Sequence, residues 1–240
     1  LKYTLGLAKA AQEMGVDLFE ESPVQNWSGK DEVSLSLPNA ALKANYLVLA
    51  GNAYLGSLGK KLSQRLMPVG TYMIATEPLG STRAGQLLPE NSAVADINFV
   101  LDYFRLSADQ RLLFGGGVSY STIPPVNVRS YLKKRMLKVF PSLDDVELEY
   151  GWGGLVGITM NRMPNFVRLA PNVFLAQGFS GHGVALTGLA GKLMAEVISG
   201  TAERFDVMSR VPHLPFPGGP LFRMPALILG TTWYRLRDLL

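Results

Sequence analysis

Residues 172–200 read NVFLAQGFSGHGVALTGLAGKLMAEVISG, and this stretch decides the fold. Val173–Gln177 predicts a short buried strand, and Gly178–Gly183 is a glycine-rich turn. A helix is predicted from about Gly183 to Ser199, with an apolar, buried face made by Ala185, Leu189, Leu193 and Val197. Such a layout lays backbone N–H groups and a helix N-terminus against an electron-rich ligand. It also occurs as a plain connection between a strand and a helix.

The composition indicates a folded chain with a substantial core. The 240 residues suffice for one large domain or two. A hydrophobic content of 48% with 18% charged residues excludes a disordered chain. Cysteine is absent, which excludes disulfides, thiolate catalysis and cysteine-ligated metals. The two histidines, His182 and His213, form no H-x-x-x-H pair, so we expect no metal site.

The net charge of +4 is mild. The densest basic run is Lys133–Arg135, with Arg129 and Lys138 nearby. One interpretation is a nucleic-acid patch, and the other is the solvated face of an amphipathic helix that begins near Asn127. We favour the helix face because neither interleaved aromatic residues nor a nucleic-acid motif accompanies the charges. No nucleic-acid partner is therefore expected.

The chain begins with Leu1 and not with methionine. Its first residues, LKYTLGLAKAAQEMG, read as a helix already under way. They lack the basic region followed by an apolar core that marks a signal peptide. We therefore interpret the chain as part of a longer protein whose N-terminal portion is missing, and we expect a cytoplasmic location.

The order of predicted elements indicates α/β (α+β) architecture. Near the N-terminus, Val16–Glu20 predicts a short strand, Tyr46–Ala50 a strand covered on both faces, and Ser57–Leu66 a helix. From about residue 68 to 165 we predict an antiparallel sheet with one helix. Val146–Trp152 and Gly157–Met160 are its last two strands. The resulting division is 1–67, 68–165, 166–200 and 201–240.

The last forty residues differ from the rest. Four prolines lie between Val211 and Pro220, which excludes a helix or a central strand there. The apolar part of Leu221–Leu240 is too short and too interrupted to span a bilayer. We predict a C-terminal helix that docks on its own domain or on a second subunit of an oligomer. The alternative is an interfacial helix that makes a peripheral membrane contact.

Several stretches resemble the D-amino-acid-oxidase-like (DAO) family of FAD-dependent oxidoreductases, which includes amine and amino-acid oxidases. Phe174–Gly183 resembles the family's C-terminal flavin-contacting motif. The other matching stretches, in the family's order, are Leu47–Ala53, Pro68–Leu79, Tyr103–Leu106 with Leu112–Gly116, and Gly151–Thr159. The resemblance covers residues 1 to about 200. It implies the second half of an FAD-binding Rossmann-like domain plus an antiparallel-sheet substrate domain.

Two departures from the family pattern are informative. The G-x-G-x-x-G turn that holds the cofactor pyrophosphate is absent, and Gly178–Gly183 spells G-x-x-G-x-G instead. The family's amino-acid oxidases carry an arginine that holds the substrate carboxylate, and Val156 stands at that position here. The resemblance therefore implies an amine substrate without a carboxylate beside the oxidised carbon. A distal carboxylate would be held elsewhere, with Arg105 or Arg162 as candidates.

The resemblance also implies which residues meet the ligands. Val24 would contact the adenine end of FAD, and Ala50 with Gly51 the ribose and pyrophosphate region. The predicted residues at the flavin ring are Phe179, Ser180, Gly181, His182, Gly183 and Val184. The predicted substrate residues are Tyr103, Arg105, Trp152, Val156 and Thr159. His182 as a simple turn residue, and Tyr103 and Trp152 as packing residues, remain open alternatives. No acid–base residue can be named.

The implied activity is FAD-dependent oxidation of an amine C–N bond. The substrate would be γ-glutamylputrescine-like or another N-substituted amine, because the proline-rich tail resembles that branch of the family. The imine product would hydrolyse to an aldehyde, and O₂ would be reduced to H₂O₂. Three alternatives stay open. They are a non-catalytic fragment or subunit that needs a partner with the G-x-G-x-x-G segment, a sarcosine, glycine or amino-acid oxidase, and a quinone-linked dehydrogenase.

Overall fold

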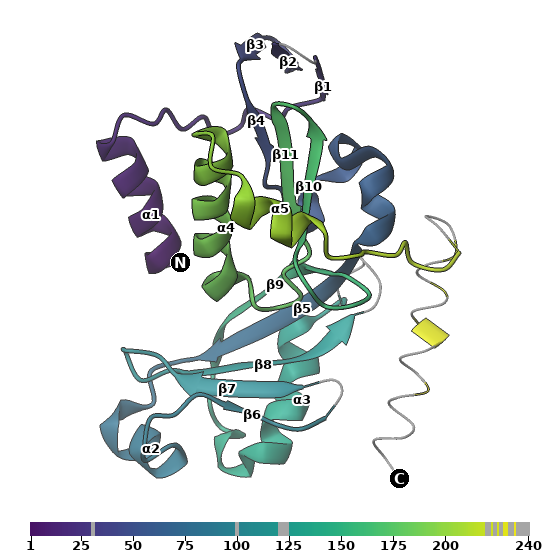
Figure 1. Ribbon diagram of the computed structural model, residues 1–240. Coiled ribbons are helices and arrows are strands. Elements are labelled where there is room, and N and C mark those ends of the chain that lie inside the picture. The colour runs from purple at the N-terminus through teal and green to yellow at the C-terminus, as the bar shows by residue number, and fades with distance from the viewer. Residues whose placement is uncertain are drawn as a thin grey trace.

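The computed structural model describes residues 1–29, 32–98, 101–119 and 125–218, together with Phe222, Pro225, Ile228, Leu229 and Trp233. The predicted C-terminal helix falls almost entirely outside the described residues. Three sheets organise the described part of the chain (Figure 1).

The N-terminal region contains one helix and a small sheet. α1 spans Lys2–Glu13, as predicted, and Gly15 follows it with a φ of +88°. None of the residues of α1 is buried. Strands β1 (Asn26–Ser28), β2 (Val33–Ser36) and β3 (Ala41–Ala44) form an antiparallel sheet. The strand predicted at Val16–Glu20 is wrong, because each of its residues is exposed and none of them belongs to a strand.

The second sheet carries the segment that decides the fold. Its order is β10 (Asn165–Ala170), β11 (Val173–Gln177) and β4 (Leu47–Leu49). β11 pairs in parallel with β4 and antiparallel with β10, and all five of its residues are buried. The short strand predicted for Val173–Gln177 is thus confirmed. β10 was not predicted, and it supplies the second neighbour that buries β11.

Two helices cover this sheet. α4 spans Gly183–Ile198 and α5 spans Glu203–Ser209. The buried residues of α4 are Ala190, Leu193, Met194 and Val197, with Leu186 partly buried beside them. Leu193 and Val197 are buried as predicted, whereas Ala185 and Leu189 are exposed and the first half of the predicted face is wrong. The sheet contacts the stripe that begins at Leu186, and the Leu189 side of α4 remains open.

Two 3₁₀ segments lead from β4 to the third sheet. They span Asn52–Tyr54 (η1) and Gly56–Arg65 (η2). The α-helix predicted over Ser57–Leu66 is therefore a 3₁₀ helix. Gly56 has a φ of +56° at its start, and glycine is a poor α-helix former.

The third sheet has five antiparallel strands. They are β5 (Met67–Thr76), β6 (Val94–Ala95), β7 (Asp102–Leu106), β8 (Leu112–Ser119) and β9 (Leu148–Ile158), in the order β6-β7-β8-β5-β9. β9 unites the two strands predicted between Val146 and Met160, because it pairs continuously with β5. The predicted antiparallel sheet is confirmed, but it carries a second helix, α2 (Gly80–Leu87), besides α3 (Val128–Val139).

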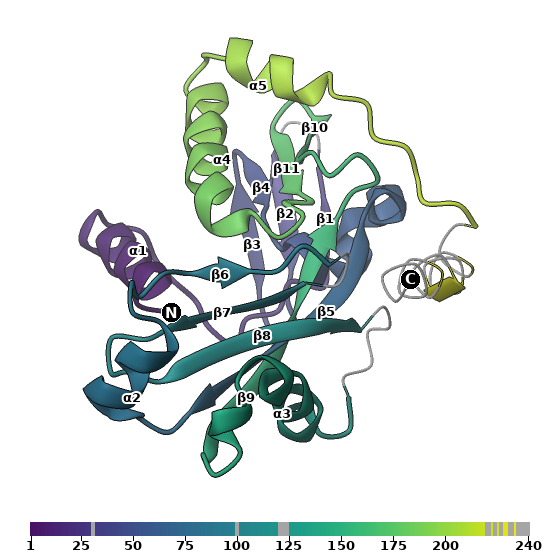
Figure 2. The same cartoon turned by 90° about the horizontal axis from the view of Figure 1, so that it is seen from below.

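One face of the five-stranded sheet is packed against α3. Leu132 and Met136 of α3 are fully buried in a core with Tyr72, Ile74 and Phe114. The amphipathic helix predicted around the basic run is thus confirmed, and Asn127 caps it by accepting from the Ser130 N–H at 2.9 Å. Figures 1 and 2 show α3 on one side of this sheet and α4 on the other.

Candidate functional site

The glycine turn after β11 packs closely on one side only. Gly178 follows the buried Gln177 with a φ of +78°. A β carbon at Gly178 would collide with the methyl group of Thr159, so no larger residue fits there. Gly181 has a φ of +91°, and no atom lies within 4 Å of the place where its β carbon would be. The turn therefore faces open space at Gly181.

The N-terminus of α4 presents backbone donors to that space. His182 is the N-cap residue, and its side chain makes no capping hydrogen bond. The first intrahelical bond runs from the Leu186 N–H to the His182 carbonyl at 3.1 Å. The N–H groups of Gly183, Val184 and Ala185 thus have no acceptor within the helix. Because Val184 is 80% exposed, the donors and the positive end of the helix dipole are accessible.

This arrangement fits the carbonyl-bearing side of a flavin ring. The ring offers oxygen acceptors, and its reduced form carries negative charge. Unpaired N–H groups at a helix N-terminus bind such oxygens and stabilise such charge. Gly181, His182, Gly183 and Val184 are the residues of this chain that would hold the ring.

Phe179 and Ser180 support the turn from inside. Phe179 is buried in the core beneath α4. The Ser180 N–H donates to the Gly157 carbonyl at 2.9 Å, and its hydroxyl donates to the Gly178 carbonyl at 3.2 Å. Both were predicted to contact the cofactor. The structure places both residues where they fix the backbone of the turn.

The end of β4 lies beside the same turn. Parallel strands end at the same edge of a sheet, so Ala50 and Gly51, which follow β4, lie near Gly178. Both residues are exposed. Asn52 makes the link, because its Oδ1 accepts a hydrogen bond from the Gly178 N–H at 2.9 Å. Its φ of +45° is one that asparagine tolerates better than most residues.

Val24 lies apart from this group. It is half-buried and precedes β1 by two residues. Figure 1 shows β1, β2 and β3 at the end of β4 opposite to α4's N-terminus. The predicted adenine contact and the predicted ring contacts are therefore separated along the length of β4.

Thr159 follows β9 directly. It is 1% exposed, and its hydroxyl donates to the Met163 carbonyl at 2.8 Å. The methyl group of Thr159 faces Gly178. Thr159 was predicted to contact substrate, and the structure places it as internal support for the turn.

A row of residues crosses the open face of the five-stranded sheet. Phe104 stacks on Phe114 in the core under α3, so by alternation its neighbour Tyr103 points to the opposite face. Successive registers then align one residue from each strand, in the order Ala95, Tyr103, Gly115, Met73 and Trp152. Tyr103 and Trp152, both predicted as substrate residues, thus share one row.

Arg105 and Val156 belong to the same face. Arg105 lies two residues beyond Tyr103, opposite Leu113. Its Nε donates to the Leu106 carbonyl at 3.2 Å, and among the described residues it forms no ion pair. Val156 lies four residues from Trp152 along β9, toward the glycine turn. The face therefore has a valine near the turn and an arginine at its far end.

Tyr54 was not predicted and borders this face. Its hydroxyl accepts a hydrogen bond from the Leu155 N–H at 2.7 Å and lies 3.4 Å from where a Gly154 β carbon would be. Its side chain is 68% exposed. Nothing in its local sequence distinguishes it, because the contact spans 101 residues.

The environment of Tyr103 keeps its hydroxyl protonated. Burial raises the pKa of this phenol, and the nearby carboxylate of Asp102 raises it further. Asp102 is itself paired with Arg135, with 2.7 Å between its Oδ1 and the Arg135 Nε. Tyr103 is therefore a neutral hydrogen-bonding group at neutral pH.

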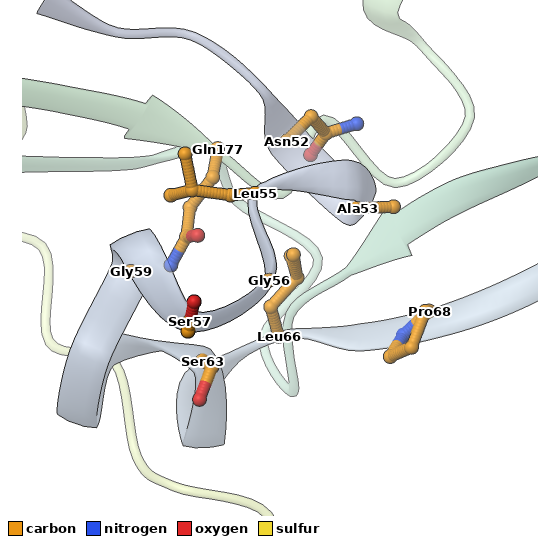
Figure 3. A pocket seen from close by; sticks show the side chains of 10 residues that line it. All are labelled: Asn52, Ala53, Leu55, Gly56, Ser57, Gly59, Ser63, Leu66, Pro68 and Gln177. Atoms are coloured by element: carbon orange, nitrogen blue, oxygen red, sulfur yellow. The ribbon is translucent and has the colours of Figure 1, made fainter. Parts of the chain in front are cut away.

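A cavity of about 270 Å³ lies behind the turn (Figure 3). It is lined by Asn52, Ala53, Leu55, Gly56, Ser57, Gly59, Ser63, Leu66, Pro68 and Gln177. Gln177 is 1% exposed and donates from Nε2 to the Leu62 carbonyl at 3.3 Å. The mixed polar lining suits ordered water.

The described residues contain neither a helix suited to cross a membrane nor a cluster of metal-ligand side chains. No helix there combines the length and the apolar character that a membrane crossing requires. Within the same ranges, no three side chains of the types His, Cys, Asp or Glu gather as metal ligands.

Comparison with protein families identifies the class of this fold and site. Residues 1–197 match the DAO family, described as FAD dependent oxidoreductase. The chain belongs to this family.

Two curated relatives are similar to this chain over nearly its whole length. The chain is 43% identical over 239 residues to gamma-glutamylputrescine oxidoreductase of Escherichia coli (strain K12), covering 99% of this chain and 56% of that protein. It is 39% identical over 243 residues to the probable oxidoreductase OrdL of Haemophilus influenzae, covering 99% of this chain and 56% of that protein. The chain thus spans about half the length of the curated relatives it matches.

Solved structures share the fold. L-proline dehydrogenase from P. horikoshii superposes with a TM-score of 0.67 at 20% identity, over 88% of this chain and 56% of the other. Glycine oxidase from Geobacillus kaustophilus gives a TM-score of 0.67 at 20% identity, over 80% of this chain and 52% of the other. The predicted α/β (α+β) fold class, with its antiparallel sheet, is confirmed.

Proposed function

We propose that this chain forms the substrate-binding sheet and one wall of the flavin site in an FAD-dependent oxidase of N-substituted amines. The substrate would resemble γ-glutamylputrescine. The observation that carries the proposal is Val156, which lies on the sheet face next to the glycine turn, where the family resemblance implies a carboxylate-binding arginine in the amino-acid oxidases. The 43% identity to gamma-glutamylputrescine oxidoreductase supports the same substrate class.

The charges on the sheet face favour such a substrate. A valine cannot bind the carboxylate of an amino acid, so an α-carboxylate beside Val156 would lose its water without gaining a partner. Arg105 lies at the other end of the face and suits a carboxylate at the distal end of a long amine. Arg111 is less suitable, because its Nη1 lies 2.6 Å from Glu149 and its Nε 2.7 Å from Asp109.

Residues of this chain would orient the reaction. Bound FAD supplies the hydride acceptor. The amine carbon loses a hydride and the amine nitrogen a proton, which gives an imine that water hydrolyses to an aldehyde and ammonia. O₂ takes up the two electrons and two protons as H₂O₂. The N–H groups at the start of α4 stabilise negative charge beside them, and the chain need not supply a base if the amine arrives neutral.

The test compares substrates on the purified flavin-containing enzyme. Under anaerobic conditions, γ-glutamylputrescine is expected to bleach the visible flavin absorbance faster than free D- or L-amino acids. In air, a peroxidase-coupled assay is expected to detect H₂O₂ without an added electron acceptor. Faster bleaching by a plain amino acid would contradict the proposal and favour a sarcosine, glycine or amino-acid oxidase.

Three surface features favour a second function. β4 is an edge strand, α1 has no buried residue, and Leu189 on α4 is exposed. These surfaces suit a chain that needs a partner carrying the G-x-G-x-x-G segment. Purified chain that stays colourless in excess FAD, but turns yellow with such a partner, would support this alternative. A dependence on added quinone would instead indicate a quinone-linked dehydrogenase.

A further inference from the structure

We infer that the open face of the five-stranded sheet carries a slot for an unbranched methylene chain, with Tyr103 and Trp152 as walls and Met73 as floor. The inference rests on the proposed function and deepens it. It assigns chain-length specificity to Met73, and it assigns to Gly115 the placement of one wall.

The walls follow from the strand register. Met73 pairs with Gly115 on one side and with Trp152 on the other. A β carbon at Gly115 would lie 2.5 Å from Cζ and 2.9 Å from Cδ2 of Tyr103. The Tyr103 ring therefore lies over Gly115 and leans toward Met73. Trp152 is 46% exposed on the far side of Met73.

The width of the slot suits one alkyl chain. The backbones of β8 and β9 lie on either side of β5, two strand spacings or roughly 10 Å apart. The Tyr103 ring covers the β8 side and the Trp152 side chain rises from the β9 side. A chain that lies above Met73 would run between these two aromatic groups, which favours apolar methylene groups and disfavours branches.

The slot has different chemistry at its two ends. One end lies toward Thr71 and Gly154, next to Tyr54 and the glycine turn. The other end continues over Ala75 and Leu113, which are paired in the next row, and reaches Arg105 beside Leu113. The rows are two residues, roughly 7 Å, apart along the strands. A substrate with its amine at the turn and its carboxylate at Arg105 therefore has an uncharged chain between them.

The test measures binding as a function of chain length. The probes are γ-glutamyl n-propylamide, n-butylamide and n-pentylamide, which carry the methylene chain without the oxidisable amine. Their affinities for the flavin-containing enzyme are measured by quenching of tryptophan fluorescence, and Trp152→Phe identifies the signal of that wall. Wild-type enzyme is expected to prefer one chain length, with each methylene changing Kd by up to about tenfold.

Substitutions at the floor then locate the slot. Met73→Phe fills the space and is expected to raise Kd for the preferred amide on the order of tenfold. Met73→Ala is expected to flatten the chain-length preference. Met14→Phe is the matched control, because Met14 is 86% exposed at the end of α1. Flavin content and melting temperature establish that each variant folds.

The outcomes separate this inference from the proposed function. If no N-acyl diamine reduces the flavin, the proposed function fails, whatever the amides do. If N-acyl diamines reduce the flavin but the Met73 variants leave the chain-length profile unchanged, the slot does not exist. Equal affinities for all three amides in the wild type would overturn it as well.

Discussion

The ring of Tyr103 lies over the α carbon of Gly115, so closely that a β carbon there would come within 2.5 Å of its Cζ. Gly115 is buried in β8 and pairs with Tyr103 in β7. We expect Gly115→Ala to displace the ring and to lower the free energy of unfolding by about 1–3 kcal/mol. Urea denaturation followed by circular dichroism measures this change.

Gly85→Ala is the control for this prediction. Gly85 lies inside α2, and no atom lies within 4 Å of its β-carbon position. Alanine is the better helix former, so this variant is expected to gain about 0.5–1 kcal/mol. A Gly115→Ala variant as stable as the wild type would show that the ring does not occupy this place.

Asn52 connects two segments of the flavin site, since its side chain accepts the Gly178 N–H at 2.9 Å. Asn52→Gly keeps the left-handed backbone but leaves that N–H without its acceptor, at a cost of about 1–3 kcal/mol. We expect weaker FAD retention, measured by equilibrium dialysis. Asn52→Asp keeps an acceptor and is expected to retain FAD more tightly than Asn52→Gly. If Asn52→Gly retained FAD more tightly than Asn52→Asp, the hydrogen bond between Asn52 and Gly178 would not matter for FAD retention.

The sequence predicted those parts of the fold that local patterns determine. The apolar run of Val173–Gln177, the turn at Gly178–Gly183 and the amphipathic stretch after Asn127 each carry their own signal. The second half of the predicted face of α4 is correct, with Leu193 and Val197 buried, but the first half is wrong. Leu189 is as apolar as Leu186, and only the sheet decides which of them is covered.

The site was less predictable because it depends on register. Tyr103 and Trp152 were assigned by resemblance, and only the pairing of β7, β8, β5 and β9 shows that they share a row. Tyr54 carries no motif, and Asn52, although it lies within the matching stretch Leu47–Ala53, was given no predicted contact. Their partners lie 101 and 126 residues away in the sequence. Thr159 looked like a polar residue near substrate, but its hydroxyl is used within its own loop.

Substitutions of Arg105 test whether it binds the distal carboxylate of the substrate. We expect Arg105→Gln to raise KM for γ-glutamylputrescine about tenfold, because hydrogen bonds to charged groups contribute about 1.5–3 kcal/mol. Putrescine lacks the distal carboxylate, so its KM is expected to change little. Arg105→Lys keeps the charge without the planar guanidinium, so its KM for γ-glutamylputrescine is expected to lie between those of the wild type and Arg105→Gln. Steady-state kinetics with both amines decides the matter, and an equal effect on both would remove Arg105 from the binding site.

The imidazole of His213, whose two nitrogens are buried, leads us to expect that the stability of the fold depends on pH. The Phe216 N–H donates to the Gln64 carbonyl at 2.9 Å and the Asn161 side chain to the Pro212 carbonyl at 2.8 Å, so the segment around His213 is docked. Both ring nitrogens are buried, with no hydrogen-bond partner among the described residues. Burial lowers the pKa of His213 from 6.5, and the nearby charge of Arg65 lowers it further, although the Pro164 carbonyl opposes this.

Because the pKa of His213 is lower in the folded state, the unfolded state binds a proton at His213 more readily, and acid therefore destabilises the fold. Stability contributed by neutral His213 is present above pH 6.5 and is lost as the pH falls through the lowered pKa. We expect the urea midpoint to drop between about pH 7 and pH 5, and His213→Gln to reduce that drop. An unchanged drop in His213→Gln would assign the pH dependence to other groups.

Val156 decides between an amine and an amino acid as substrate. Val156→Arg introduces a guanidinium that can bind a carboxylate at two points, on the face that carries Trp152 and next to the glycine turn. We expect kcat/KM for a plain amino acid such as glycine to rise at least about tenfold and that for γ-glutamylputrescine to fall, since the added charge crowds the amine end. Val156→Leu changes size without charge and is expected to leave glycine turnover at the wild-type level. If Val156→Arg and Val156→Leu have the same effect on both substrates, the volume of this side chain determines selectivity and its charge does not.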